Sequence, residues 1–257
     1  MVPITEQDKL SPLYKYYERP MVEPEPGAYE SVQEPVAPEL GTSPFDMNKM
    51  FDDGYLPLER GFCQLPDGGA MLANLTPMPG VTPEMFDFWF AWHGCGPLRY
   101  TIWNRDQHYS AVTQNMDKAM DKSLSLKERY WDTTHDVDED VGMGRQKILI
   151  NFRNPADIGF DPEKLRNFGG TIVCAGNAES PTIMVHFLRP TADGCELRTR
   201  FWMGYNVVNG KPHKMIPDGV KFPLEPVKAL LTHNMKEFTH LASILPEIYK
   251  EFAPDFI

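Results

Sequence analysis

One stretch near the C-terminus places chemically active side chains at helical spacing. LLTHNMKEFTHLA, residues 230–242, carries His233, Glu237 and His240 among leucines and a methionine. His233 and Glu237 are four residues apart, so in a helix they share one face with β-carbons about 6 Å apart. One metal ion could bind both side chains, although such a pair is also common at a surface or core edge. His240 lies about 10 Å farther along the helix than His233, so we expect it to pack or to support the site.

Other histidines and carboxylates lie upstream. His108 closes the stretch WNRDQH, and Glu139 lies in YWDTTHDVDEDVG, whose acidic run is also typical of a solvated loop. His93, within the apolar stretch WFAWHGC, is more typical of a hydrogen-bonded core histidine. His213, within NGKPHK, is typical of an exposed loop. Spacing alone therefore leaves several ligand sets open.

The composition limits the class of protein. The 257 residues carry a formal net charge of −11, and 42% of them are hydrophobic. The acidic balance argues against nucleic-acid or anionic-membrane partners, which need a basic face. The 4 cysteines form no C-x-x-C pair, which argues against a cysteine zinc site. No apolar run reaches the roughly 18 residues of a membrane span, and the N-terminus lacks a signal-peptide core, so we expect a cytoplasmic protein.

The elements that position these residues are predicted to begin after residue 80. TPEMFDFWFAWHG has a helical pattern, with Thr82 as N-cap and Gly94 as its end. LRYTIW (98–103) has a strand pattern, and residues 111–130 suggest helix or loop. Four more strands are predicted in GRQKILINFRN, GGTIVCAGN, PTIMVHFLRPT and GCELRTRFWMGYNVV, with a TADG hairpin joining the last two.

A helical pattern of about thirty residues, LEPVKALLTHNMKEFTHLASILPEIYKEFA, follows the strands. Pro246 should kink or break this helix. Antiparallel strands that end in one long helix predict an α+β domain, residues 81–257, whose sheet curls around the helix. A cavity between sheet and helix is a usual place for a small-molecule site.

Residues 1–80 differ from the rest of the chain. They are rich in proline, as in PMVEPEPGAYESVQEPVAPELGTSP. Proline fixes φ and removes a backbone donor, so few regular elements are expected here. Scattered aromatic residues are candidate anchors. We expect an extended arm that packs on its own domain or on a partner subunit, and the second arrangement would make the protein a homo-oligomer.

Three stretches, WFAWHGCGPLRYTIWNRDQHY, YWDTTHDVDEDVG and HNMKE, resemble the family of 2,4-diacetylphloroglucinol hydrolases and phloretin hydrolases. The match runs through most of residues 82–240. The resemblance implies a helix-grip (Bet v 1-like) catalytic domain with an N-terminal appendage. It also implies a metal ion, typically Zn²⁺, held by two histidines and two glutamates. Position by position, the implied ligands are His108, Glu139, His233 and Glu237.

Two details of this ligand set stay open. Glu139 has close neighbours that could take its place, namely Glu128, His135 and Asp138. Fe²⁺ or Mn²⁺ would also accept nitrogen and oxygen ligands, so the sequence does not fix the metal.

The resemblance further implies residues that bind the substrate and move protons. These are a tyrosine before the first metal ligand, then a histidine and a tyrosine on later strands. Tyr100 fits the first, and His186 and Tyr205 are the candidates for the other two. Without the resemblance, His186 is equally typical of a hydrogen-bonded histidine in a sheet, and Tyr205 of core or rim packing.

The implied activity is hydrolysis of the carbon–carbon bond between an acyl group and a polyhydroxylated, phloroglucinol-type ring. Two other classes stay open. One is a metalloenzyme of different chemistry at the same site, such as a decarboxylase, cyclase or tautomerase acting on a phenol or polyketide. The other is a non-enzymatic small-molecule binding protein, since one fold hosts many functions. Release of a carboxylic acid would distinguish the hydrolase from both.

Overall fold

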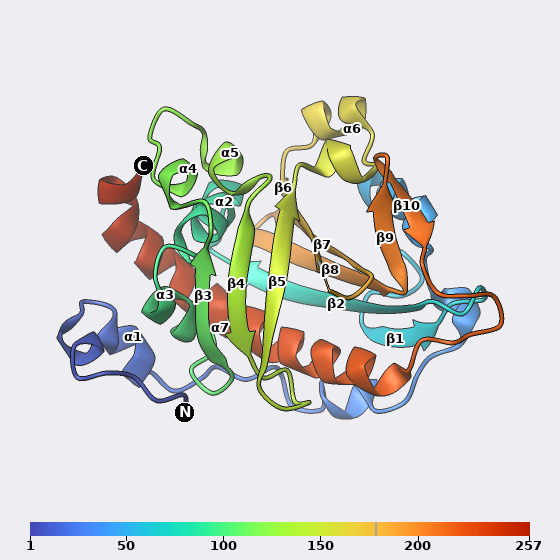
Figure 1. The fold of residues 1–257 in the computed structure, drawn as a ribbon, viewed down its shortest axis with the longest axis horizontal. Helices are drawn as coiled ribbons and strands as arrows, with labels where there is room; N and C mark the ends of the chain where they lie inside the picture. Colours follow the sequence, from blue (N-terminus) through green and yellow to red (C-terminus); the bar gives the residue numbers. More distant parts are fainter. Residues whose placement is uncertain (178) are drawn as a thin grey trace.

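The structure, a computed structural model, describes residues 1–177 and 179–257. Its main feature is an eight-stranded antiparallel sheet in the order β1-β2-β8-β7-β6-β5-β4-β3. The strands at the two ends of this order run in clearly different directions, and the long C-terminal helix α7 packs against β1, β2 and α2 (Figure 1). The predicted α+β class, with a large antiparallel sheet and a C-terminal helix, is confirmed.

The described elements have the following bounds. The sheet contains β1 (Gly61–Gln64), β2 (Ala70–Pro79), β3 (His108–Thr113), β4 (Thr134–Glu139), β5 (Gln146–Arg153), β6 (Thr171–Asn177), β7 (Thr182–Thr191) and β8 (Gly194–Met203), and β9 (Tyr205–Val208) pairs with β10 (Lys211–Lys214) in a small second sheet. The α-helices are α1 (Tyr14–Glu18), α2 (Pro83–Trp92), α3 (Pro97–Thr101), α4 (Met116–Ala119), α5 (Leu126–Tyr130), α6 (Pro162–Asn167) and α7 (Leu224–Phe256). Short 3-10 helices span Asp8–Leu10, Glu30–Val32, Pro38–Leu40, Pro44–Phe51 and Pro155–Ile158.

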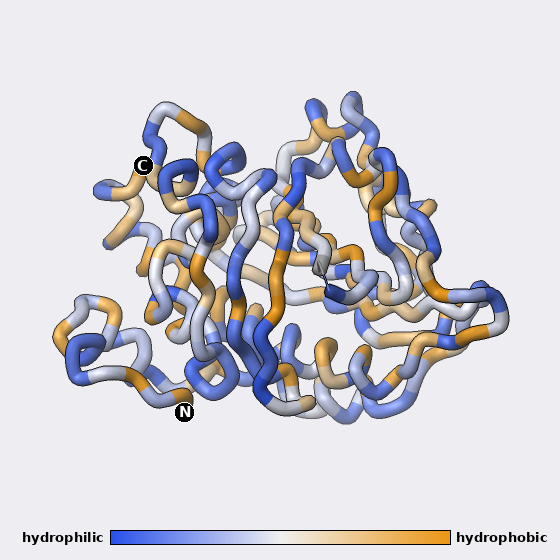
Figure 2. Tube along the Cα trace, viewed as in Figure 1, coloured by the Kyte–Doolittle hydropathy of each residue, from blue (hydrophilic) through white to orange (hydrophobic). Residues whose placement is uncertain are grey.

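Helix α2 begins and ends as predicted. The Thr82 hydroxyl accepts a hydrogen bond from the Met85 N–H at 3.2 Å, which caps the first turn. Seven of its ten residues are buried, as its apolar surface on all sides requires. The predicted strands β5 to β8 are also confirmed, and β7 and β8 form the predicted hairpin, with Thr191 opposite Gly194. Figure 2 shows the hydrophobic middle of β5 between hydrophilic ends.

The strand predicted for residues 98–103 is wrong. Pro97 is in the first turn of the short helix α3, where its missing N–H costs nothing. Leu98 and Ile102 are both buried, and their four-residue spacing suits a helix as well as a strand. Tyr100 therefore lies on a helix that precedes β3.

Strands β3 and β4 were missed by the sequence pattern because their buried face is polar. Along β4, His135, Val137 and Glu139 alternate on one face, as in any strand, but two of the three are polar. The acidic run is therefore a strand rather than a solvated loop. His108 begins β3.

The expectation of few regular elements before residue 80 is wrong for residues 61–79, which form β1 and β2. β2 pairs with β8 along its whole length, from Ala70 opposite Met203 to Pro79 opposite Gly194. The main sheet thus includes part of the segment that we assigned to an N-terminal appendage. Division into domains at residue 80 stays a prediction.

Helix α7 continues without a break through Pro246, so the expected break is wrong. The first residues of the chain lie against this helix. Lys15 and Arg19 pair with Glu251 and Glu247 at 2.5 and 2.7 Å. Across residues 1–177 and 179–257, no helix combines the length and apolar character that a membrane span requires.

Candidate active site

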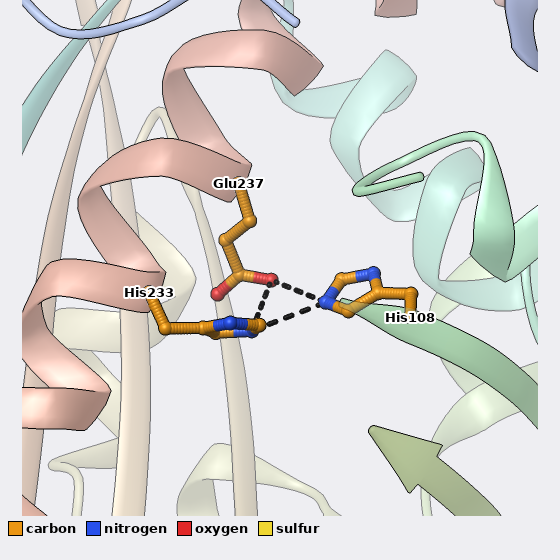
Figure 3. A group of neighbouring side chains, drawn as sticks. All are labelled: His108, His233 and Glu237. Atoms are coloured by element: carbon orange, nitrogen blue, oxygen red, sulfur yellow. Dashed lines mark hydrogen bonds and ion pairs between the residues drawn. The ribbon is translucent and has the colours of Figure 1, made fainter. Parts of the chain in front are cut away.

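Four side chains from three elements converge at one point. His108 begins β3, Glu139 ends β4, and these two residues are directly opposite each other in the antiparallel pairing. His233 and Glu237 lie one turn apart on α7 (Figure 3). The Nε2 atoms of His108 and His233 are 3.1 Å apart, and Glu237 Oε2 lies 3.5 and 3.6 Å from them. Glu139 Oε2 lies 3.9 and 4.0 Å from the same two nitrogens.

The hydrogen bonds of the Nδ1 atoms fix the tautomers of His108 and His233. His108 Nδ1 lies 3.3 Å from the carbonyl oxygen of Tyr100, and His233 Nδ1 lies 3.1 Å from Gln107 Oε1. Asn104 Nδ2 donates to the same Gln107 oxygen at 2.9 Å, which assigns it as the amide oxygen. Both partners accept only, so each Nδ1 carries the proton and each Nε2 carries a lone pair.

Two lone pairs 3.1 Å apart, beside two carboxylates, repel one another unless a cation lies between them. The donor set of two imidazoles and two carboxylates is one that Zn²⁺ accepts, at about 2.0–2.2 Å from each atom. Two such ligands at tetrahedral or right angles would lie about 3–3.6 Å apart. The separations among His108, His233 and Glu237 fall in this range. The residues present therefore fit a metal ion.

Burial shifts the pKa values of these four side chains. It raises the pKa of Glu237 well above its usual value, and the charge of Glu139 adds to this effect. Burial also raises the pKa of Glu139 to about 7, against the hydrogen bond from Tyr100. Burial lowers the pKa of His233 to about 3 and that of His108 well below its usual value. Neutral imidazoles are what a metal needs, and a cation would keep both carboxylates ionised.

A layer of side chains behind the four groups holds them in place. Asn234 Nδ2 donates to Glu237 Oε1 at 3.1 Å, and Asn74 Nδ2 donates to Asn234 Oδ1 at 3.0 Å. The indole N–H of Trp103 donates to the backbone carbonyl of Glu237 at 2.9 Å. Sequence reasoning missed these three residues and Gln107. The signal available for Asn234 was its polar side chain on the apolar face of a long helix.

Tyr100 contacts two of the four groups and also lines the cavity beside them. Its ring stacks on the His108 imidazole, with centroids 3.9 Å apart and planes 5° from parallel. Its hydroxyl donates to Glu139. Burial raises the pKa of Tyr100 well above its usual value, so the phenol stays protonated.

A cavity of about 400 Å³ opens beside the four groups. Its wall is mostly apolar and comes from α2, α3, the strands β4 to β8 and the first half of α7. Tyr100, Glu139, His186, His233 and Glu237 are among the residues that line it. His186 Nδ1 lies 2.9 Å from Thr199 Oγ1. The structure thus brings Tyr100 and His186 to the same space as the candidate ligands.

Tyr205 is not brought to this cavity. It lies in β9, where its hydroxyl donates to Asp67 Oδ1 at 2.5 Å. Its ring fills the space where a Cβ on Gly69 would lie. Tyr205 therefore packs in the core.

The neighbours of Glu139 have other partners. Asp138 forms a double ion pair with Arg145 at 2.7 and 2.8 Å, and Glu128 caps helix α5. His135 and Glu139 both lie outside the tightest group of potential ligands, which is His108, His233 and Glu237. Glu139 lies 3.9 Å from His108 Nε2, whereas the His135 ring lines the cavity beside His93. His240 is buried and accepts a hydrogen bond from the Val22 N–H at 3.1 Å, which is the packing role expected for it.

The remaining histidines are placed as expected. His93 is buried, and its Nδ1 donates to the Trp89 carbonyl at 2.9 Å. His213 is exposed.

Comparison with known proteins identifies relatives of this chain. The chain is 38% identical to phloretin hydrolase of Eubacterium ramulus, over 97% of this chain and 93% of that protein. It is 29% identical to 2,4-diacetylphloroglucinol hydrolase of Pseudomonas protegens, over 94% of this chain and 84% of that protein. The family described as the DAPG hydrolase PhiG domain matches residues 42–250. The chain therefore belongs to the DAPG hydrolase family.

Proposed function

We propose that the protein is a metal-dependent hydrolase that cleaves the carbon–carbon bond between an acyl group and a phloroglucinol-type ring. One observation carries the proposal: in a chain of this family, His108, Glu139, His233 and Glu237 converge beside an apolar cavity, and the last three of them line it. The names of the relatives, phloretin hydrolase and 2,4-diacetylphloroglucinol hydrolase, point to the substrate class.

These four residues would hold one divalent ion. Zn²⁺ suits the mixed nitrogen and oxygen donors, and Fe²⁺ or Mn²⁺ would accept the same set. When bound, such an ion supplies Lewis-acid chemistry, which polarises a carbonyl and makes water a better nucleophile near neutral pH.

The chain's own residues would manage the protons. The leaving group of a carbon–carbon hydrolysis is a carbanion, so the ring must first ketonise: one phenol O–H loses its proton, and the acyl-bearing carbon gains one. Water then adds to the acyl carbonyl. The carbon–carbon bond breaks with its electron pair passing to the ring, which leaves as an enolate and becomes a phenol when it is protonated. The products are a carboxylic acid and the deacylated ring.

Tyr100 and His186 are suited to these proton movements because both line the cavity. The Tyr100 hydroxyl already donates to Glu139, so a proton can pass between this pair and a ring hydroxyl. Burial keeps His186 neutral, with its pKa lowered to about 3. We keep Tyr205 out of this proposal because the geometry places it elsewhere. We also infer a helix-grip (Bet v 1-like) arrangement, supported by the curved sheet and α7.

The test is a product assay. Purified, metal-loaded protein is incubated with phloretin, 2-acetylphloroglucinol and 2,4-diacetylphloroglucinol, and acid and ring products are quantified by mass spectrometry. Stoichiometric acid and deacylated ring are expected. The di-O-methyl ether of acetylphloroglucinol, which cannot ketonise as readily, should react far more slowly. Turnover without acid would indicate a decarboxylase, cyclase or tautomerase instead, and binding without turnover would indicate a carrier.

A further inference from the structure

The cavity has a closed end and a mouth. Phe90, His93, His135, Phe152 and His186, each at most 3% exposed, line one part of it and contact one another. The opposite part is lined by residues that are partly or fully exposed: Val141, Met143, Gln146, Phe222, Pro226 and Leu230. A ligand would therefore enter past Met143 and Phe222, and its leading group would reach the three histidines.

His135 is a fixed side chain with open hydrogen-bonding capacity. Its ring packs edge-on against Phe152, with centroids 4.7 Å apart, and lies 5.3 Å from the His93 ring. A Cβ on Gly94 would lie 2.3 Å from its Cε1, so the glycine leaves room for the imidazole. Its Nδ1 is buried without a partner, and no hydrogen bond joins its Nε2 to the described part of the chain. Leaving a buried polar group unpaired is destabilising, so a ligand that supplies its partner is favoured.

The two neighbouring histidines repeat this pattern. His93 Nδ1 donates to a backbone carbonyl, so its Nε2 carries a lone pair. His186 uses Nδ1 for Thr199. Within residues 1–177 and 179–257, neither Nε2 has a hydrogen-bond partner. Three neutral imidazoles thus offer unused nitrogen atoms at the closed end of an otherwise apolar cavity, which is a pattern suited to several hydroxyls on one ring.

The spacing along β4 fits a ring between these histidines and the metal ligands. His135, Val137 and Glu139 all line the cavity. Four residue steps along the strand place His135 about 13 Å from Glu139. This length accommodates one hydroxylated ring whose acyl carbonyl lies near Glu139 and whose far hydroxyl reaches His135.

We propose that His93 and His135 are specificity-determining residues that hydrogen-bond the ring hydroxyl para to the acyl group. The ring enters first, and the acyl chain points to the mouth. This assignment rests on the proposed function, and it makes the enzyme strict toward ring hydroxyls and tolerant of acyl chain length. A site built to bind a hydroxyl strongly rejects the analogue that lacks it.

The experiment compares His135→Phe with the unmodified protein on two substrates, 2-acetylphloroglucinol and 2,6-dihydroxyacetophenone, which lacks the para hydroxyl. The unmodified protein should favour the first by about 10²-fold or more in kcat/KM. His135→Phe keeps the aromatic packing, and should lose most of this preference by slowing only the trihydroxy substrate. Equal losses on both substrates would overturn the proposal. His213→Asn, on an exposed loop, is the control and should match the unmodified protein.

Two further measurements separate the possible failures. Calorimetric binding of phloroglucinol, the ring product, should weaken at least tenfold in His135→Phe and stay unchanged in His213→Asn; unchanged binding in both variants would overturn the proposal. This readout needs no turnover, so it stands even if no acylphloroglucinol is hydrolysed and the proposed function fails. If His135→Phe does not fold, Gly94→Ala displaces the same imidazole and should give the same loss of preference. Met143→Ala, at the mouth, should change the dependence on acyl chain length and leave the hydroxyl preference intact.

Discussion

His108 and Glu139 face each other across the β3–β4 ladder, and the pairing shifts by one residue immediately after them. His108 is opposite Glu139, but Ser110 is opposite Asp138, so Tyr109 is an extra residue on β3. Such a bulge re-aims the neighbouring side chain. It lets His108 project toward α7, where His233 and Glu237 complete the site.

Metal content should follow the four ligands. We expect about one transition-metal ion per chain, and none in His233→Ala, by elemental analysis after dialysis. A metal that binds only the folded state at a hundred times its Kd stabilises it by about 2.7 kcal/mol. Chelation should therefore lower Tm by about 5–10 °C in the unmodified protein and leave His233→Ala unchanged. Full occupancy in His233→Ala would show that the ligand set is wrong.

His240 should support the fold and not the metal. His240→Asn removes or lengthens the hydrogen bond that the Val22 N–H makes at 3.1 Å, and should cost about 1–2 kcal/mol of the free energy of unfolding. Its metal content should stay at the level of the unmodified protein. Loss of metal as complete as in His233→Ala would place His240 among the ligands.

Asn234 should tune metal affinity through Glu237. Asn234→Ala removes the amide that donates to Glu237 Oε1 and that accepts from Asn74. Loss of such a supporting residue typically weakens metal binding by about 10–100-fold, which competition with a chromogenic chelator would measure. Thr232→Ala is the matched control on the same helix, since the Thr232 hydroxyl donates to the Lys228 carbonyl and not to a candidate metal ligand. Equal affinities in the two variants would contradict the prediction.

Glu59 should make the stability depend on acid pH. Its carboxylate lies between the buried Arg198 and Arg200, at 2.6 and 2.7 Å. Burial raises the pKa of Glu59, but the hydrogen bonds and charges of the two arginines outweigh burial, and the net pKa is lowered. The folded state thus holds the Glu59 proton more weakly than the unfolded state, in which the pKa of the carboxyl group is about 4.3. The stabilisation is complete above that pH and is lost as the pH falls through the lower, folded value.

Glu59→Gln should therefore cost about 3 kcal/mol near neutral pH, because two buried cations lose their anion. Urea unfolding from about pH 7 to pH 3 should show the difference between the two proteins shrinking at the acid end. Glu39→Gln, at an exposed position, serves as the control. A difference that stays constant with pH would show that the ion pair is not its source.

The sequence predicted those parts of the site whose residues follow the regular spacing or the composition of a helix or a strand. His233 and Glu237 were placed on one helical face by their spacing, and the apolar strands β5 to β8 by their composition. β4 was hidden because its inward side chains include His135 and Glu139, so the face that should look hydrophobic looks charged. Tyr100 was placed on a strand because Leu98, Tyr100 and Ile102 alternate along the chain. The four-residue spacing of Leu98 and Ile102 also fits a helix, and Pro97 in the first turn favours the helix that forms.

Long-range contacts were beyond any local pattern. Nothing near Asn74 in the chain indicates that it lies beside Asn234, since tertiary packing of β2 against α7 brings the two residues together. Tyr205 shows the opposite error. It was the candidate for the later-strand tyrosine that the family resemblance implies, but the left-handed Gly204, with φ of +91°, turns the chain into a separate hairpin.

The long ladder between β2 and β8 has a consequence for biosynthesis. Ala70 leaves the ribosome long before Met203, its partner, and α7, which covers β2, is made last. β1 can pair with Ala70–Ala73 as soon as both are made, but the edge of β2 that faces β8 stays unpaired through most of translation. Strands that wait for distant partners fold slowly and are prone to aggregate. High-level expression should benefit from slower translation, lower temperature or added chaperone more than from any change at the site itself.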